Sequence, residues 1–101
     1  MANNTPDRIA ELFARTRAEG RPAVIPFVPA GWPEFDATPE IVQAAIDGGA
    51  DAIELGLPFS DPLADGATNQ QAYYEALQQG TTPVTLLDTV RSLRASGITI
   101  P

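Results

Sequence analysis

The 101-residue sequence predicts an α/β fold that is part of a (β/α)8 barrel, or TIM barrel, and two observations support this prediction. Short strand-like segments alternate with helical patterns along the chain, as they do in folds built on parallel strands. In the segment 51–57 the aliphatic residues at 53, 55 and 57 share one face of a strand, and Glu54 lies on the other face. An apolar face opposite a lone carboxylate suits a barrel strand with its aliphatic side under helices and its glutamate at the barrel mouth.

A helix is expected near the start of the chain, after a disordered-looking segment over residues 1–4. Thr5 as N-cap, Pro6 in the first turn and Asp7 beside it indicate where this helix begins, and Gly20 indicates where it ends. Apolar residues at 9, 12 and 13 recur at helical spacing. This pattern predicts a helix that packs against the rest of the fold.

The first strand is expected over residues 23–28, which are rich in β-forming residues. Pro26 within it has no N–H to donate, so it argues against a fully paired central strand. A turn-rich loop over 29–36 holds Trp32, and a Thr-Pro pair at 38–39 then begins a helix that ends at Gly48 and Gly49. With the strand at 51–57 these segments form a βαβ unit, whose two strands run parallel.

Two more helices follow the loop after the second strand. One is expected over residues 68–79, with Ala72, Tyr73 and Ala76 on its packed side, and the other begins at the Thr-Pro pair 82–83 and ends at Gly97. Residues 98–101 resemble the opening of a third strand. A closed barrel needs about 250 residues, so we expect the chain, 1–101, to be an N-terminal fragment of a single barrel domain, or otherwise to associate.

Composition excludes several classes of function. The chain has neither cysteine nor histidine, which rules out disulfides, thiol and imidazole chemistry and Cys/His metal sites within it, and no metal is expected. A net charge of -7 argues against nucleic acid and anionic membranes as partners. No apolar run approaches membrane-spanning length, and no signal-peptide pattern precedes the fold. We therefore expect a cytoplasmic protein.

Glu54 and Asp65 are the candidate catalytic residues. Glu54 ends a parallel strand, where barrel enzymes place working groups, and partly apolar surroundings would favour its protonated form. Asp65 follows a proline-rich loop and could face Glu54 across a substrate. Residue spacing alone leaves simpler interpretations open: a solvent-facing glutamate, an Asp-Gly turn at 65–66 and a loop corner at Asp61–Pro62.

The motif E-L-G-L-P-F-S-D-P-L-A-D-G, residues 54–66, resembles the signature of the tryptophan synthase alpha chain family. P-F-V-P-A-G-W-P at 26–33 and G-A-D-A-I-E at 49–54 resemble neighbouring segments of the same family. The resemblance runs from about residue 9 to the last residue. It implies a (β/α)8 barrel lyase that cleaves the small molecule indole-3-glycerol phosphate, in a retro-aldol reaction, to indole and glyceraldehyde 3-phosphate.

The resemblance also implies roles for individual residues. Glu54 matches the family's acid/base glutamate, and Asp65 matches the aspartate that takes the indole N–H proton. Phe27 and Leu55 fall where the family lines its indole pocket. One departure is Ala67, where the family usually has proline, and it bears on loop stiffness more than on chemistry.

The loop 58–62, with Pro58, Asp61 and Pro62, resembles the segment that contacts the tryptophan synthase beta chain in an alpha2-beta2 heterotetramer. The cofactor, pyridoxal phosphate, belongs to that beta chain, and none is expected in this chain. The family's phosphate site and catalytic lid lie in later segments, so we expect no turnover from these 101 residues alone. Two alternatives stay open: an inactive segment that only docks a beta chain, and part of a stand-alone indole-3-glycerol-phosphate lyase.

Overall fold

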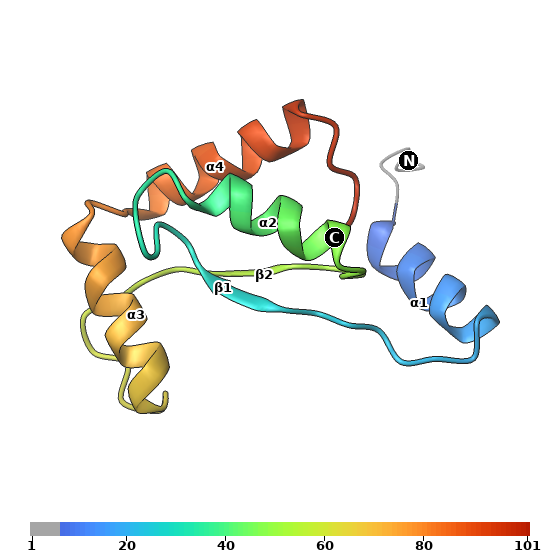
Figure 1. Ribbon diagram of the computed structural model, residues 1–101, viewed down its shortest axis with the longest axis horizontal. Coiled ribbons are helices and arrows are strands. Elements are labelled where there is room, and N and C mark those ends of the chain that lie inside the picture. The colour runs from blue at the N-terminus through green and yellow to red at the C-terminus, as the bar shows by residue number, and fades with distance from the viewer. Residues whose placement is uncertain (1–6) are drawn as a thin grey trace, which may run out of the picture.

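A computed structural model describes residues 7–101, and Figure 1 shows its elements in chain order. They are α1 (Arg8–Ala18), β1 (Phe27–Pro29), α2 (Thr38–Asp47), β2 (Glu54–Gly56), α3 (Ala67–Gln78) and α4 (Pro83–Ala95). The predicted disordered start, the Thr5 cap and Pro6 lie outside the described residues. Asp7 is the N-cap of α1, since its carboxylate accepts a hydrogen bond from the Ala10 N–H at 3.0 Å.

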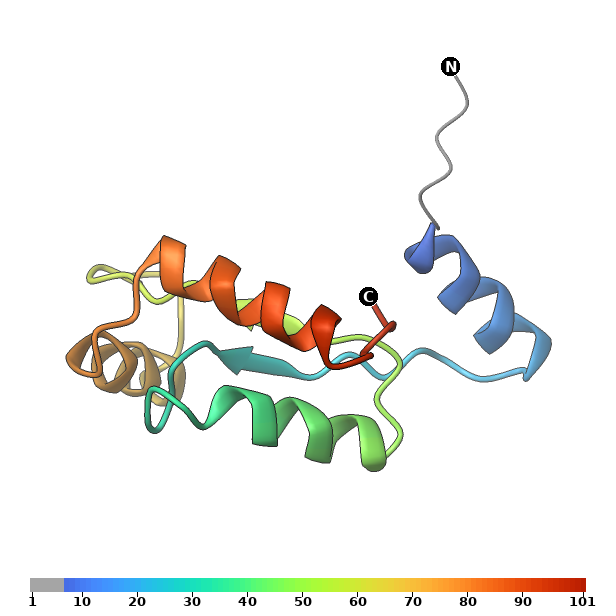
Figure 2. The same ribbon diagram turned by 90° about the horizontal axis from the view of Figure 1, so that it is seen from above.

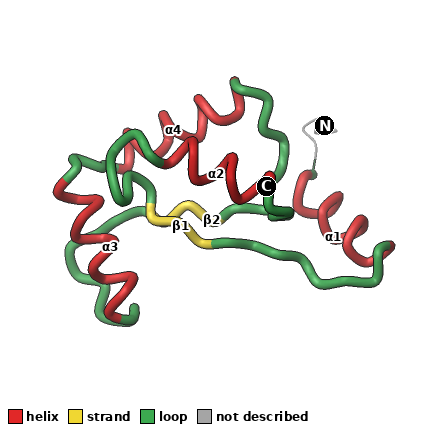
Figure 3. The backbone as a smooth tube through the Cα atoms, viewed as in Figure 1, coloured by secondary structure: helices red, strands yellow, loops and turns green. Residues whose placement is uncertain are grey.

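The two strands are short and parallel, as Figure 3 shows, and their register pairs Phe27 with Glu54, Val28 with Leu55 and Pro29 with Gly56. Backbone hydrogen bonds continue the pairing upstream, where Asp51 N–H donates to the Val24 carbonyl and Glu54 N–H to the Pro26 carbonyl, both at 2.9 Å. The predicted first strand, 23–28, is correct in kind but wrong in its bounds, because β1 begins at Phe27. Pro26 has no N–H, so the ladder is incomplete before that residue.

The helices occupy different positions around the strand pair. Figures 1 and 2 show α2 and α4 along the strands, α1 at the strands' amino-terminal end and α3 at their carboxyl-terminal end. Leu12, Val28, Val42, Ala52 and Leu93 are among the buried apolar residues. The βαβ unit and its covering helices therefore match the predicted part of a (β/α)8 barrel.

The predicted helix starts differ in how their threonines are used. Thr82 caps α4, and its hydroxyl accepts from the Thr85 N–H at 3.2 Å while the Thr85 hydroxyl accepts from the Thr82 N–H at 2.8 Å. Thr38 instead is the first residue of α2, and its buried hydroxyl accepts a hydrogen bond from the Gly31 N–H at 2.9 Å. Thr38 thus fixes the loop that follows β1.

A charged clasp holds the amino-terminal end of the strand pair. The buried Asp51 carboxylate accepts hydrogen bonds from both terminal nitrogens of Arg21, at 2.8 and 2.9 Å, from Arg15 at 3.2 Å and from the Val24 N–H at 2.8 Å. The paired Arg21 guanidinium, with the Val24 N–H, holds the pKa of Asp51 far below its usual value. The clasp therefore joins α1 and the segment after it to Asp51, three residues before β2 begins at Glu54.

Residues 98–101 run beside β2 without being assigned as a strand. The Ile53 N–H donates to the Pro101 carbonyl at 2.9 Å, so this segment occupies the position expected for the start of a third strand.

None of the helices within residues 7–101 combines the length and the apolar character that crossing a bilayer requires.

Candidate functional site

The candidate site lies on the face of the strand pair that α2 and α4 do not cover. The prediction that Glu54 ends its strand is wrong, because β2 runs from Glu54 to Gly56. Glu54 is the first residue of β2, and its register partner Phe27 is the first residue of β1. Both are exposed, and 40% of Phe27 is accessible to solvent. Side chains alternate along a strand, so Glu54 and Phe27 share the face opposite Leu55 and the buried Val28. Glu54 is therefore exposed to solvent, whereas the sequence predicted partly apolar surroundings for it.

An aromatic cluster stands beside this carboxylate. The Tyr73 ring, on α3, meets Phe27 edge to face with centroids 6.3 Å apart, and it lies tilted against Phe59 at 5.8 Å. Gly56 makes room for this arrangement, since a Cβ there would lie 2.5 Å from Phe27 Cζ and 3.4 Å from Tyr73 Cε1. A strand residue, a loop residue and a helix residue thus form one aromatic wall.

Asp65 lies at the same end of the molecule, in the turn before α3. It is half-buried, its N–H donates to the Pro62 carbonyl at 3.1 Å, and its own carbonyl accepts from the Gln70 side chain at 2.7 Å. Burial raises the pKa of the Tyr73 hydroxyl, and the negative charge of Asp65 raises it further. The Tyr73 ring in turn contacts Phe27, the register partner of Glu54.

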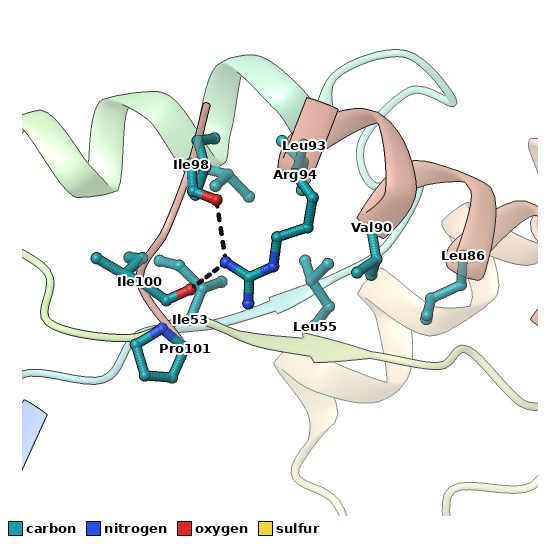
Figure 4. A pocket seen from close by; sticks show the side chains of 10 residues that line it. Ile53, Leu55, Leu86, Val90, Leu93, Arg94, Ile98, Ile100 and Pro101 are labelled. Atoms are coloured by element: carbon teal, nitrogen blue, oxygen red, sulfur yellow. Dashed lines mark hydrogen bonds between the residues drawn. The ribbon is translucent and has the colours of Figure 1, made fainter. Parts of the chain in front are cut away.

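Leu55 does not join this group. It lies on the opposite face of β2, in an apolar cavity of about 270 Å³ between the strands, α2, α4 and residues 98–101, which Figure 4 shows. Arg94 spans the cavity edge and donates to the carbonyls of Ile98 and Ile100 at 3.0 and 2.7 Å. Leu55 and Phe27 therefore lie on opposite faces of the strand pair, and the expectation that both line a substrate pocket stays a prediction.

The loop predicted to contact a partner is surface-exposed in part. Pro58 is buried, Pro62 is half-buried and Asp61 is exposed. Phe59 and Leu63 present apolar surface, with 49% and 85% of their areas accessible. Exposed apolar side chains such as Phe59 in the loop and Leu63 beside it are typical of contact surfaces, and the role of the loop stays a prediction.

The sequence did not predict the contact between Tyr73 and Phe27. The residue was expected on the packed side of its helix, and it is buried there with Ala72 and Ala76. The small neighbours at 72 and 76 indicate packing, but no motif points to Phe27, which lies 46 positions earlier in the sequence. The contact arises from the chain topology alone.

A parallel βαβ unit with two helices on one face and an exposed carboxylate on the other matches a segment of a (β/α)8 barrel. Comparison with known proteins identifies the family. The family model described as tryptophan synthase alpha chain matches residues 13–101, and the chain belongs to this family.

Individual relatives agree with this assignment. The tryptophan synthase alpha chains of Albidiferax ferrireducens and Chloroflexus aggregans are 51% and 48% identical to the chain, over 93% and 94% of its length. The structure of the alpha subunit from Legionella pneumophila superposes over 96% of the chain with a TM-score of 0.91 and 31% identity. Tryptophan synthase from M. tuberculosis, in an aminoacrylate-bound form, gives a TM-score of 0.82 over 91% of the chain at 34% identity.

The match covers only part of each relative. The chain spans about a third of their length, namely 34% and 36% of the two alpha chains and 37% and 38% of the two solved chains.

Proposed function

We propose that this chain supplies the first part of a tryptophan synthase alpha barrel, which cleaves indole-3-glycerol phosphate to indole and glyceraldehyde 3-phosphate. Glu54 serves as the acid/base group on the glycerol side chain and the indole C3, and Asp65 takes the indole N–H proton. The observation that carries the proposal is the exposed Glu54 carboxylate beside Phe27, on the face of the strand pair that α2 and α4 do not cover. A general acid or base must reach its substrate, and this face is accessible.

The chemistry needs two groups on different sides of the indole. Breaking the carbon–carbon bond requires a proton on C3 and loss of a proton from a side-chain hydroxyl, which one carboxyl group can relay. A second carboxylate stabilises the indolenine tautomer by accepting the ring N–H proton. Glu54 on a strand and Asp65 on the following turn come from different elements, so the two groups can act from different directions. The aromatic edge of Phe27 supports binding of a flat ring between them.

Activity also requires parts that lie outside the matched third of the family. Phosphate binding in such barrels is built from loops near the last strands. The test is therefore a chimaera in which residues 1–101 replace the matching third of the Albidiferax ferrireducens alpha chain, with which they share 51% identity. Indole release from indole-3-glycerol phosphate is expected from the chimaera and not from the 101-residue chain alone. An inactive but folded chimaera, judged by circular dichroism and gel filtration, would refute the proposal.

We further propose that the loop 58–62 contacts a tryptophan synthase beta chain, in which pyridoxal phosphate converts indole and serine to tryptophan. The exposed Asp61 carboxylate and the exposed Phe59 ring support this proposal. Calorimetric titration of the chimaera with the beta chain of the same organism is the test. Asp61→Ala should weaken binding about 10-fold, as loss of a charged contact does, whereas the exposed Asp36→Ala should leave binding unchanged. Equal affinities for the two variants would contradict this role.

A further inference from the structure

Tyr73 is the buried member of the aromatic wall, and it has no role in the proposed reaction. Only 6% of the residue is exposed, whereas the two rings that it contacts, Phe27 and Phe59, belong to residues that are 40% and 49% exposed. A ligand can contact the exposed parts of the two phenylalanines, but it cannot reach most of the tyrosine ring. Any effect of Tyr73 on binding must therefore act through the side chains that it contacts.

The orientation of the Phe27 side chain depends on Gly56 and on Tyr73. The Phe27 ring lies over Gly56, since a Cβ there would be 2.5 Å from Phe27 Cζ and 2.8 Å from Cε2. Gly56 pairs with Pro29, two residues after Phe27, so the ring leans toward the carboxyl-terminal end of the strand pair. There it meets the Tyr73 ring edge to face, with centroids 6.3 Å apart. The tyrosine thus limits the rotamers that Phe27 can adopt.

Tyr73 is itself held in place by contacts on two sides. The Trp32 side chain donates from Nε1 to Glu75 Oε2 at 2.6 Å, which joins the loop after β1 to α3 two positions beyond Tyr73. The Phe59 ring, from the loop after β2, lies tilted against Tyr73 with centroids 5.8 Å apart. A buried ring on a helix that is tied to its neighbours in this way has little freedom to move. It can therefore act as a fixed support for Phe27.

We propose that Tyr73 is a positioning residue for Phe27: its ring holds the Phe27 side chain in the orientation that meets a flat aromatic substrate on the face that carries Glu54. The inference rests on the proposed function in one respect, namely that Phe27 lies against the indole ring. A side chain that is already ordered before binding favours affinity, because ordering a free side chain costs part of the binding free energy. In this role the ring of Tyr73 acts, and its hydroxyl is dispensable.

The contact is tested in the chimaera by urea unfolding, without any turnover. Tyr73→Leu and Phe27→Leu each remove one ring, and the double variant removes both. Because the two rings support each other, the double variant should lower the urea midpoint by less than the sum of the two single effects. Tyr73→Leu combined with Leu12→Ala is the control, since α3 and α1 lie at opposite ends of the strand pair, and these effects should add. Additive effects for Tyr73→Leu and Phe27→Leu would overturn the inference even if the chimaera is active.

The positioning role is tested by the kinetics of the same variants. Tyr73→Leu should raise KM for indole-3-glycerol phosphate about 3–10-fold with little change in kcat, because a released Phe27 must be ordered each time substrate binds. Tyr73→Phe keeps the ring and should restore KM, and Leu12→Ala should show that lower stability alone leaves KM unchanged.

A kinetic cycle shows whether Tyr73 acts through Phe27. In the Phe27→Leu background, Tyr73→Leu should raise KM no further, because the side chain that it positions is already gone. The unfolding and kinetic experiments separate the two proposals, since the unfolding measurement needs no turnover. An unchanged KM for Tyr73→Leu in the active chimaera, or an equal increase in the Phe27→Leu background, would overturn the inference.

Discussion

Replacing Gly31 with alanine tests how the loop after β1 is held at the candidate site. Gly31 has φ +84°, in the left-handed region, and its N–H donates to the buried Thr38 hydroxyl at 2.9 Å. A Cβ at this position would overlap the Thr81 hydroxyl, closer than real Cβ contacts occur. The left-handed conformation costs about 1–2 kcal/mol for alanine, and forcing an atom into a packed site costs about 1–3 kcal/mol more. We therefore expect Gly31→Ala to lower the free energy of unfolding by about 2–5 kcal/mol.

Gly80 provides the matched control. Its φ is +88°, almost the same as that of Gly31, but a Cβ there would meet no atom within 4 Å. Gly80→Ala should therefore cost only the conformational part, about 1–2 kcal/mol. Urea unfolding followed by fluorescence of Trp32, the single tryptophan, measures both variants.

A second change separates the clash from the strain. Thr81 Oγ1 is buried without a hydrogen-bond partner, so Thr81→Ala alone should cost little for the loss of the hydroxyl. Combined with Gly31→Ala it should recover about 1–3 kcal/mol, the overlap contribution. A Gly31→Ala variant no less stable than Gly80→Ala, or no recovery in the double variant, would show that the loop does not pack on Thr81 as described.

Two further predictions concern the clasp and the core. Asp51 has a pKa below its ordinary value in the folded chain, so it contributes stability above the unfolded pKa, about 3.9, and this contribution is lost as pH falls through the folded-state pKa. The midpoint of thermal unfolding should therefore be lower for Asp51→Asn than for the unmodified chain at about pH 6, and this difference should shrink below about pH 4. A difference that does not change with pH would contradict the prediction. An equal effect from Asp47→Asn, a change at an exposed position, would also contradict it. Leu12 on α1 is only 2% exposed, so Leu12→Ala should lower the free energy of unfolding by about 2–5 kcal/mol. Leu87 is 61% exposed, so Leu87→Ala should change the free energy of unfolding by no more than about 0.5 kcal/mol. Similar urea midpoints for the two variants would show that α1 does not pack as described.

The sequence predicted the helices better than the contacts between them. The Thr-Pro pairs located the starts of α2 and α4 to within one residue, because these signals act over a single turn. The face pattern around Glu54 also indicated correctly which side of β2 lies under helices. The same pattern places Leu55 on the helix-covered side, opposite Phe27, and its role in a substrate pocket stays a prediction.

Contacts made by distant segments could not be predicted in this way. The Tyr73–Phe27 contact and the Asp51–Arg21 pair join residues 46 and 30 positions apart. No local periodicity encodes which side chains meet when a βαβ unit closes. Thr38 shows the same limit. The sequence predicts that it caps a helix, but its hydroxyl accepts a hydrogen bond from the Gly31 N–H in the loop after β1.

The most direct measurement is the rate of indole formation by the chimaera carrying Glu54→Gln. Glutamine keeps the shape of the side chain but cannot transfer the proton, so kcat should fall by about 10²–10⁴. Glu40→Gln, an exposed change at the start of α2, should retain the rate of the unmodified chimaera. A Glu54→Gln chimaera as active as its Glu40→Gln counterpart would contradict the assignment of Glu54 as the acid/base group.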